Sequence, residues 1–188
     1  MRRLTRLVSV GAITATALGL VAQPAFANGD DDDHERGAKP AVFVPTNDSA
    51  GNQVVAYARG ADGNLTFAAS YSTGGQGGAL NGAAVDKLAS QGALTYDARH
   101  HLLFTVNAGS NTVSVFKTNG THLSLRQVIS SGGSFPVSVA VHGNVVYVLN
   151  ARTGGSIQGF RLDDGRLHPS GTRTVRWVSL SSPTAQSS

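Results

Sequence analysis

Three asparagines occupy similar places in a repeated pattern and could bind a polar ligand. Asn47, Asn107 and Asn150 each end a β-rich run, and Arg152 follows the third of them. An amide side chain has two donors and an acceptor oxygen, and a guanidinium adds five donors. If the fold brings these groups to one face, they form a site for a small polar ligand. The alternative is a repeated structural role, because asparagine also caps strands through local hydrogen bonds to the backbone.

The remaining residues that could carry chemistry form no catalytic pattern. Most aspartates of the folded part lie in turn sequences, where Asp bonds its own backbone. Asp48 and Asp86 lie in loops and could reach a binding face, and no glutamate follows Glu35. The histidines flank turns without the spacing of metal ligands, and no Gly-x-Ser-x-Gly nucleophile motif is present. We therefore assign no catalytic residue and expect no metal and no cofactor.

The N-terminus has the pattern of an export signal. A basic start with Arg2, Arg3 and Arg6 precedes an apolar run, and Ala25-Phe26-Ala27 provides a small-x-small cleavage pattern. The apolar run is shorter than the ~20 residues of a transmembrane span. We expect residues 1–27 to be a signal peptide and the chain to be secreted to the extracellular side.

Composition narrows the possible partners. The chain has 188 residues and a formal net charge of +4, part of which belongs to the predicted signal. The other basic residues are scattered and do not form the stripe typical of nucleic-acid binding. No later segment is apolar enough for a membrane span, and the absence of cysteine excludes disulfides. Residues 28–40 are acidic and should be flexible.

The elements that must position the asparagines repeat with a period of about 40–45 residues, the mark of a β-propeller. Each β-rich run is followed by a polar loop, a second run ending in an aromatic residue, a Gly-containing turn and a leucine. In the second copy we expect strands at about 92–96, 102–107, 112–117 and 123–129. In the third copy we expect them at about 137–141, 145–150, 156–162 and 167–175. The predicted fold is all-β, with about three four-stranded blades.

The first copy differs from the other two. It has no innermost strand, and it carries extra Gly- and Ala-rich residues at 74–92, of which Gly74–Gly78 is interpreted as a flexible loop. The predicted blades are about 41–78, 92–131 and 137–175, together a partial propeller at 41–175. Residues 176–188 are rich in Ser and Thr and are expected to be a disordered tail. No strand is evident that could close a ring.

The segment from Gly92 to Phe116, with Leu103-Phe104-Thr105-Val106-Asn107 at its centre, resembles the lactonase-family propellers. This seven-bladed group includes 6-phosphogluconolactonase and overlaps the YVTN repeat proteins. The segment from Pro136 to Phe160 is similar to the next repeat. The resemblance covers about 41–175 and implies an incomplete, N-terminal portion of a seven-bladed ring. Family members often carry a histidine after the proline that opens a blade, whereas Val137 follows Pro136 here.

The resemblance implies an ancestral role in lactone hydrolysis, with this short chain weakly active or inactive. A sugar acid or lactone would then be the small polar ligand of Asn47, Asn107, Asn150 and Arg152. The alternatives are a noncatalytic extracellular binding module and a fragment with no function of its own. Open blade faces in an incomplete propeller would expose apolar surface and favour self-association.

Overall fold

The computed structural model describes residues 40–80, 87–88 and 90–174. The predicted signal peptide, the acidic segment up to residue 39, Asp86 and the predicted tail lie outside the described residues. Within the described part of the chain, no helix is long and apolar enough to cross a membrane.

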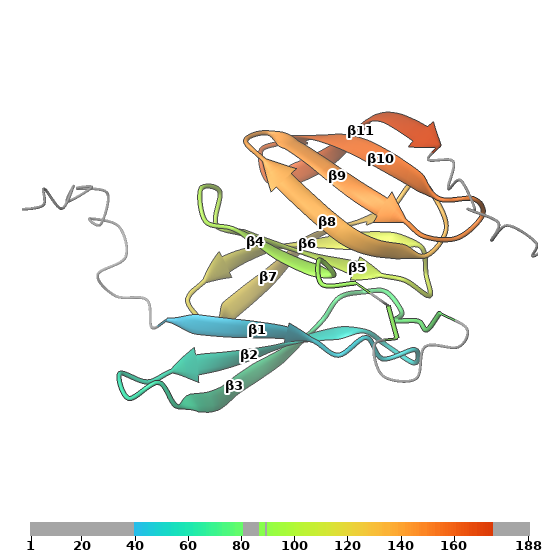
Figure 1. Ribbon diagram of the computed structural model, residues 1–188. Coiled ribbons are helices and arrows are strands. Elements are labelled where there is room, and N and C mark those ends of the chain that lie inside the picture. The colour runs from blue at the N-terminus through green and yellow to red at the C-terminus, as the bar shows by residue number, and fades with distance from the viewer. Residues whose placement is uncertain (1–39, 81–86, 89, 175–188) are drawn as a thin grey trace, which may run out of the picture. The chain divides into compact units, whose positions relative to one another are not determined.

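The described residues form eleven strands in three antiparallel sheets (Figure 1). The first sheet has the order β1-β2-β3, made of β1 (Ala41–Pro45), β2 (Gln53–Arg59) and β3 (Leu65–Ser72). The middle sheet is β4 (Leu94–Asp97), β5 (Leu102–Asn107), β6 (Thr112–Asn119) and β7 (His122–Ser130). The third sheet is β8 (Pro136–His142), β9 (Val145–Asn150), β10 (Ser156–Asp163) and β11 (Arg166–Thr174). The predicted all-β fold of propeller blades is confirmed.

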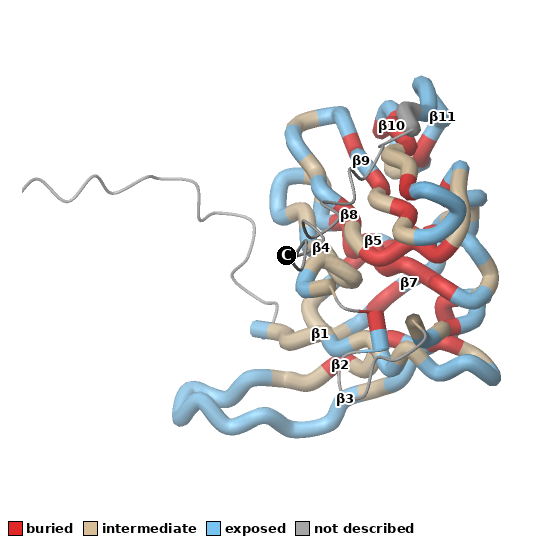
Figure 2. The backbone as a smooth tube through the Cα atoms, turned by 45° about the vertical axis from the view of Figure 1, so that its right-hand side comes forward, coloured by how far each residue is buried: buried red, intermediate tan, exposed pale blue. Residues whose placement is uncertain are grey.

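The middle sheet packs against a neighbour on each face. All six residues of β5 are buried, and alternate residues of a strand point to opposite faces. Phe104 belongs to an apolar cluster shared with the third sheet, whereas Leu103 belongs to a cluster shared with the first sheet. The buried segments of the chain accordingly concentrate around β5 (Figure 2). Burial of both faces explains why β5 has almost no polar residues before its final asparagine.

A β-bulge at the same place in each sheet aligns the three copies residue by residue. The bulges lie at Ala56/Tyr57, Val115/Phe116 and Gly159/Phe160. The extra residue of a bulge fixes the register of the strands around it. Tyr57, Phe116 and Phe160 are therefore structural counterparts. Starting from these three residues, the strand pairings identify the other equivalent positions in the three sheets.

The glycine-rich connection after β3 is not the free loop that the sequence predicts. Its backbone is hydrogen-bonded on both sides: Asn52 N–H donates to Gly75 O at 2.9 Å, and Gly109 N–H donates to Gln76 O at 2.9 Å. A Cβ on Gly75 would lie 2.5 Å from the Asn107 amide. Glycine is needed there because the backbone approaches a buried side chain closely.

Candidate functional site

Asn107 ends β5 and is completely buried. Its Oδ1 accepts a hydrogen bond from Asn52 Nδ2 at 2.9 Å. Its Nδ2 donates to Ser114 Oγ at 2.8 Å and to Thr112 Oγ1 at 3.1 Å. Both ends of the amide are thus used inside the protein. These contacts support the structural alternative for Asn107, because no part of the side chain faces solvent.

Asn150 is the counterpart of Asn107 in the third sheet and is also completely buried. Its Nδ2 donates to Ser131 O at 3.0 Å and to Ser156 Oγ at 3.3 Å. Its Oδ1 is buried and has no hydrogen-bond partner among the described residues. An unsatisfied buried acceptor costs about 1–3 kcal/mol. We therefore expect Asn150 to contribute less to stability than Asn107.

Asn47 is not the counterpart of the other two asparagines, so the predicted equivalence of the three is wrong. Pro45 pairs with Val54 as Val106 pairs with Val113, which makes Thr46 the residue equivalent to Asn107. Asn47 lies one position further on, with φ of 50°. Its amide donates to Gly78 O at 2.7 Å and accepts from Gly78 N–H at 2.9 Å.

Asn52 is a buried polar residue that sequence reasoning missed. It is almost fully buried and links the first sheet to the middle one, donating to Val106 O at 3.0 Å and to Asn107 Oδ1. A signal was available, because Asn52 precedes Tyr57 by the same interval that separates Asn111 from Phe116. Asn111 instead uses its Oδ1 to accept a hydrogen bond from Phe135 N–H at 2.7 Å. This difference is why Asn150 Oδ1 lacks the amide donor that Asn107 has.

Arg152 holds two loops together at the same end of the sheets. Its guanidinium lies 4.3 Å from the centre of the Phe135 ring and donates to Ala79 O at 3.0 Å. Its backbone N–H donates to Ser134 O at 3.1 Å. Arg152, in the loop after β9, thus contacts both the connection before β8 and the connection after β3. Of the four predicted ligand residues, Arg152 alone is exposed.

The aspartates and histidines are mostly engaged in turns. Asp48 Oδ1 accepts a hydrogen bond from Ala50 N–H at 2.8 Å. The pKa of Asp62 is held below its usual value by the backbone N–H of Asn64 and then by the Asn64 amide. Within residues 40–80, 87–88 and 90–174, no group of three or more metal-ligating side chains comes together.

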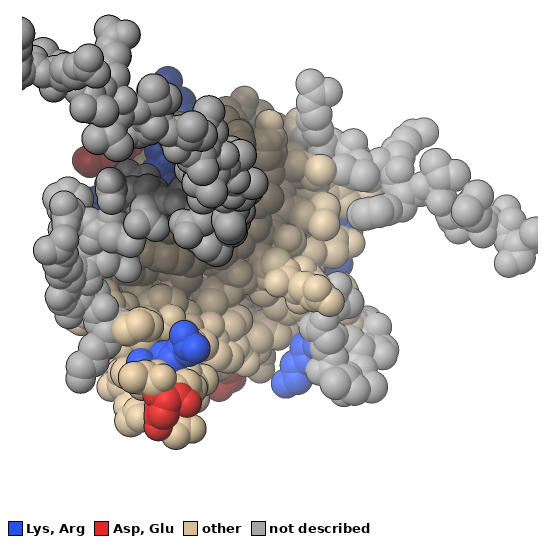
Figure 3. All heavy atoms as spheres, turned by 60° about the vertical axis from the view of Figure 1, so that its left-hand side comes forward, with Lys and Arg blue, Asp and Glu red and all other residues tan. Residues whose placement is uncertain are grey.

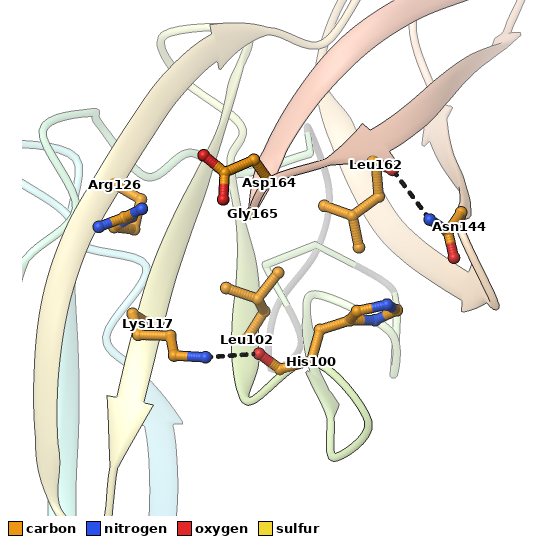
Figure 4. A pocket seen from close by; sticks show the side chains of 8 residues that line it. All are labelled: His100, Leu102, Lys117, Arg126, Asn144, Leu162, Asp164 and Gly165. Carbon is orange, nitrogen blue, oxygen red and sulfur yellow. Dashed lines mark hydrogen bonds between the residues drawn. The ribbon is translucent and has the colours of Figure 1, made fainter.

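A pocket of about 310 Å³ lies between the middle and third sheets, at the ends of the strands away from Asn107 (Figure 4). Its lining residues are His100, Leu102, Lys117, Arg126, Asn144, Leu162, Asp164 and Gly165. Leu102 and Leu162 are buried and provide an apolar floor. Lys117 Nζ donates to His100 O at 2.9 Å. Arg126 is exposed and has no hydrogen-bond or ion-pair partner among the described residues.

Hydrogen bonds fix His100, which lines this pocket, and Gln127, which follows the lining residue Arg126. His100 Nδ1 lies 2.5 Å from Asp97 Oδ2 in the turn between β4 and β5. Gln127 on β7 accepts from Leu167 N–H at 2.7 Å and donates to Leu167 O at 3.1 Å, which locks β7 to β11. The pocket combines two cationic groups, the Asp164 carboxylate, an imidazole and an apolar floor. Such a set can bind a small carboxylate.

Few charged side chains are visible on the face drawn in Figure 3, and they form no continuous basic stripe. A nucleic-acid surface would show such a stripe. On that face the visible basic side chains lie in separate small groups, some of them beside acidic side chains.

No family model matches the sequence, and no curated protein matches it. Several solved structures are similar to the chain, among them the following three. A protein from Lactobacillus plantarum is 22% identical with a TM-score of 0.52, over 66% of this chain and 36% of its own. A functionally unknown protein from Desulfotomaculum acetoxidans is 18% identical with a TM-score of 0.53, over 74% of this chain and 43% of its own.

The third is the periplasmic gluconolactonase PpgL of Pseudomonas aeruginosa, which is 20% identical with a TM-score of 0.54, over 76% of this chain and 41% of its own. The chain spans less than half the length of each of these three proteins. At these identities the likeness concerns the fold. The chain therefore shares the fold of these structures over part of their length.

Proposed function

We propose that the chain is an exported propeller-type binding protein for a small carboxylate of the sugar-acid class, with weak or no lactone hydrolysis. The main support is the pocket between the middle and third sheets, whose lining residues include cations and an apolar floor but no Ser, Thr or Cys nucleophile. The likeness in fold to a gluconolactonase supports the choice of ligand class.

The pocket suits a carboxylate joined to a polyol. The exposed Arg126 guanidinium can form two parallel hydrogen bonds to one carboxylate. Lys117 Nζ has donors left after its bond to His100 O. Asp164 lines the same pocket and can accept hydrogen bonds from hydroxyl groups. Leu102 and Leu162 offer apolar contact to the C–H groups of the ligand. Because Arg126 is exposed, we expect weak binding that falls as salt rises.

The experiment is a titration of the purified chain with gluconate, followed by NMR shifts of the backbone amides. Sorbitol, an uncharged polyol of similar size, is the matched ligand and should bind more weakly. Arg126→Gln should weaken gluconate binding by about threefold to tenfold. Arg161→Gln is the control variant, since Arg161 is an exposed arginine outside the pocket with only a 3.7 Å contact to Asp163. Equal binding of gluconate and sorbitol would contradict the proposal.

Weak lactone hydrolysis is a second candidate, supported by the His100–Asp97 contact. A carboxylate bonded to one imidazole nitrogen orients the ring and leaves the other nitrogen available as a general base for water. His100 lines the pocket and Asp97 is 2.5 Å from its Nδ1. If the pair acts in this way, hydrolysis of gluconolactone above the buffer rate should be lost in His100→Gln. Arg161→Gln, the control variant outside the pocket, should hydrolyse gluconolactone at the rate of the unaltered chain.

Export is supported by the N-terminal sequence pattern and is tested separately. Cleavage after Ala27 would leave Asn28 as the first residue. The mass of the chain recovered from the culture medium should correspond to a start at Asn28. Recovery of the intact chain from the cytoplasm alone would contradict export.

A further inference from the structure

The outer face of the third sheet exposes positions that are buried in the middle sheet. Phe104 is 0% exposed beneath the third sheet, whereas its counterpart Tyr147 is 53% exposed. Leu102 is buried and its counterpart Val145 is exposed. The difference arises because nothing among the described residues packs on this face. We call it the socket face, made of Val145, Tyr147, Leu149, Ile157, Gly159 and Gly171.

The outer face of the first sheet exposes the positions whose counterparts in the middle sheet face the first sheet. Leu123 is 3% exposed and faces the first sheet, whereas its counterpart Leu65 is 50% exposed. Phe67 is 62% exposed and contacts Tyr57 edge-on, with ring centres 6.2 Å apart. We call this the knob face, made of Val42, Val44, Val55, Tyr57, Leu65 and Phe67.

The chain already forms the same kind of contact twice, between the first and middle sheets and between the middle and third sheets. In each contact, the knob positions of one sheet face the socket positions of its neighbour. Between the first and middle sheets, the knob positions are Phe116 and Leu125, and the socket positions are Ala56 and Ala69. Between the middle and third sheets, the knob positions are Phe160 and Pro169, and the socket positions are Val115 and Gln127. Phe116 and Phe160 are buried in these interfaces, whereas Leu125 and Pro169 lie exposed at their edge. The smaller knob pair faces the larger socket pair.

The two open faces continue this relation of size. The free knob pair is Tyr57 and Phe67, the bulkiest of the three. The free socket pair is Gly159 and Gly171, the smallest of the three. A hollow of about 500 Å³ lies over the glycines and is lined by Tyr147, Ile157, Gly159, Ser170 and Gly171. The bulkiest knob pair thus matches the socket pair with the smallest residues.

We propose that the socket face of one copy docks onto the knob face of a second copy, head to tail. The contact is heterologous, because it joins two different surfaces of the same chain. Two copies that close on each other would give six sheets, within the usual range of about 4–8 propeller blades. If the rotation does not close, the same contact produces longer assemblies. The exposed apolar side chains of the socket face and the knob face favour this association, because it removes them from water.

The test combines one variant on each face with analytical ultracentrifugation over a wide concentration range. Tyr147→Glu blocks the socket face and Phe67→Glu blocks the knob face. Both side chains are exposed in one copy, so the variants should fold, which circular dichroism checks. Each variant alone should be monomeric, with association at least about a hundredfold weaker than in the unaltered chain. An equimolar mixture should form a one-to-one dimer, because each variant retains the face that the other lacks.

Tyr96→Glu is the matched control, since Tyr96 is 45% exposed and belongs to neither face. It should associate like the unaltered chain. An unaltered chain that stays monomeric at the highest concentration would overturn the proposal. So would a Phe67→Glu variant that still forms dimers while Tyr147→Glu does not, because that result indicates a contact between two socket faces. A mixture of the two variants that remains monomeric would also overturn it.

Discussion

Replacing Asn107 by alanine should distinguish a structural asparagine from a ligand-binding one. The substitution removes an amide that joins the first and middle sheets through Asn52. It also removes the donor to Ser114, whose hydroxyl in turn donates to Thr73 O at 2.7 Å. The matched variant is Asn150→Ala, at the counterpart position in the third sheet. Both residues are completely buried, so burial alone does not separate them.

The expected magnitudes follow from the hydrogen bonds that each variant loses. Asn107→Ala loses the bonds to Asn52, Thr112 and Ser114. At about 1 kcal/mol net for each bond, the loss is about 3 kcal/mol. Asn150→Ala loses two donor contacts and also removes the unpartnered Oδ1. Removal of an unsatisfied acceptor offsets part of the loss, so the cost should be about 1 kcal/mol.

The assay is urea unfolding followed by far-ultraviolet circular dichroism. Both variants should lower the midpoint without changing the slope, since the surface exposed on unfolding stays the same. The midpoint should fall more in Asn107→Ala than in Asn150→Ala. Equal or reversed losses would refute the hydrogen-bond reasoning. Unchanged stability in both variants would favour the ligand-binding hypothesis for these asparagines.

Two further predictions concern backbone packing and acid titration. Gly75→Ala should destabilise the fold by about 1–3 kcal/mol, because its Cβ would lie 2.5 Å from the Asn107 amide. Gly51→Ala is the control and should leave stability unchanged, since its Cβ would have no atom within 4 Å. The urea midpoints of the two variants provide the comparison. Asn64→Ala should raise the pKa of Asp62, which Asn64 holds below its usual value, as measured by NMR titration. The lowered pKa means that this contribution to stability is present at neutral pH and is lost only as the pH falls through the folded pKa. An unchanged Asp62 titration curve would show that the Asn64 side chain has no part in it.

The repeat pattern was sufficient to predict the strands of the second and third copies. Strand β5 begins and ends at the predicted residues, Leu102 and Asn107. The period-two alternation and the tight turns act locally, so one copy can be compared with the next. In the first copy, the sequence pattern aligned Asn47 with Asn107, whereas the strand pairing aligns Thr46 with Asn107. The error arose because a β-rich run does not show which residue pairs with which across the sheet.

The site could not be predicted in the same way. Asn52 and Gln127 look like ordinary polar residues in the sequence, yet their side chains join neighbouring sheets. The pocket at Arg126 and Asp164 combines residues of two sheets, and no local pattern links them. The Gly74–Gly78 segment looked free because its partners, Asn47 and Gly109, are distant in the sequence.

The sequence by itself determined the all-β class, the repeated strands, and the aromatic and leucine positions that align them. These features depend on side-chain alternation and on turn residues a few positions apart. Only the tertiary structure decided that Asn107 and Asn150 are buried, that Asn47 is out of step, and that a cationic pocket lies between two sheets. The reason is physical: burial and hydrogen bonding depend on which sheet lies across a face, and equivalent residues of neighbouring sheets, such as Tyr57, Phe116 and Phe160, are far apart in the chain.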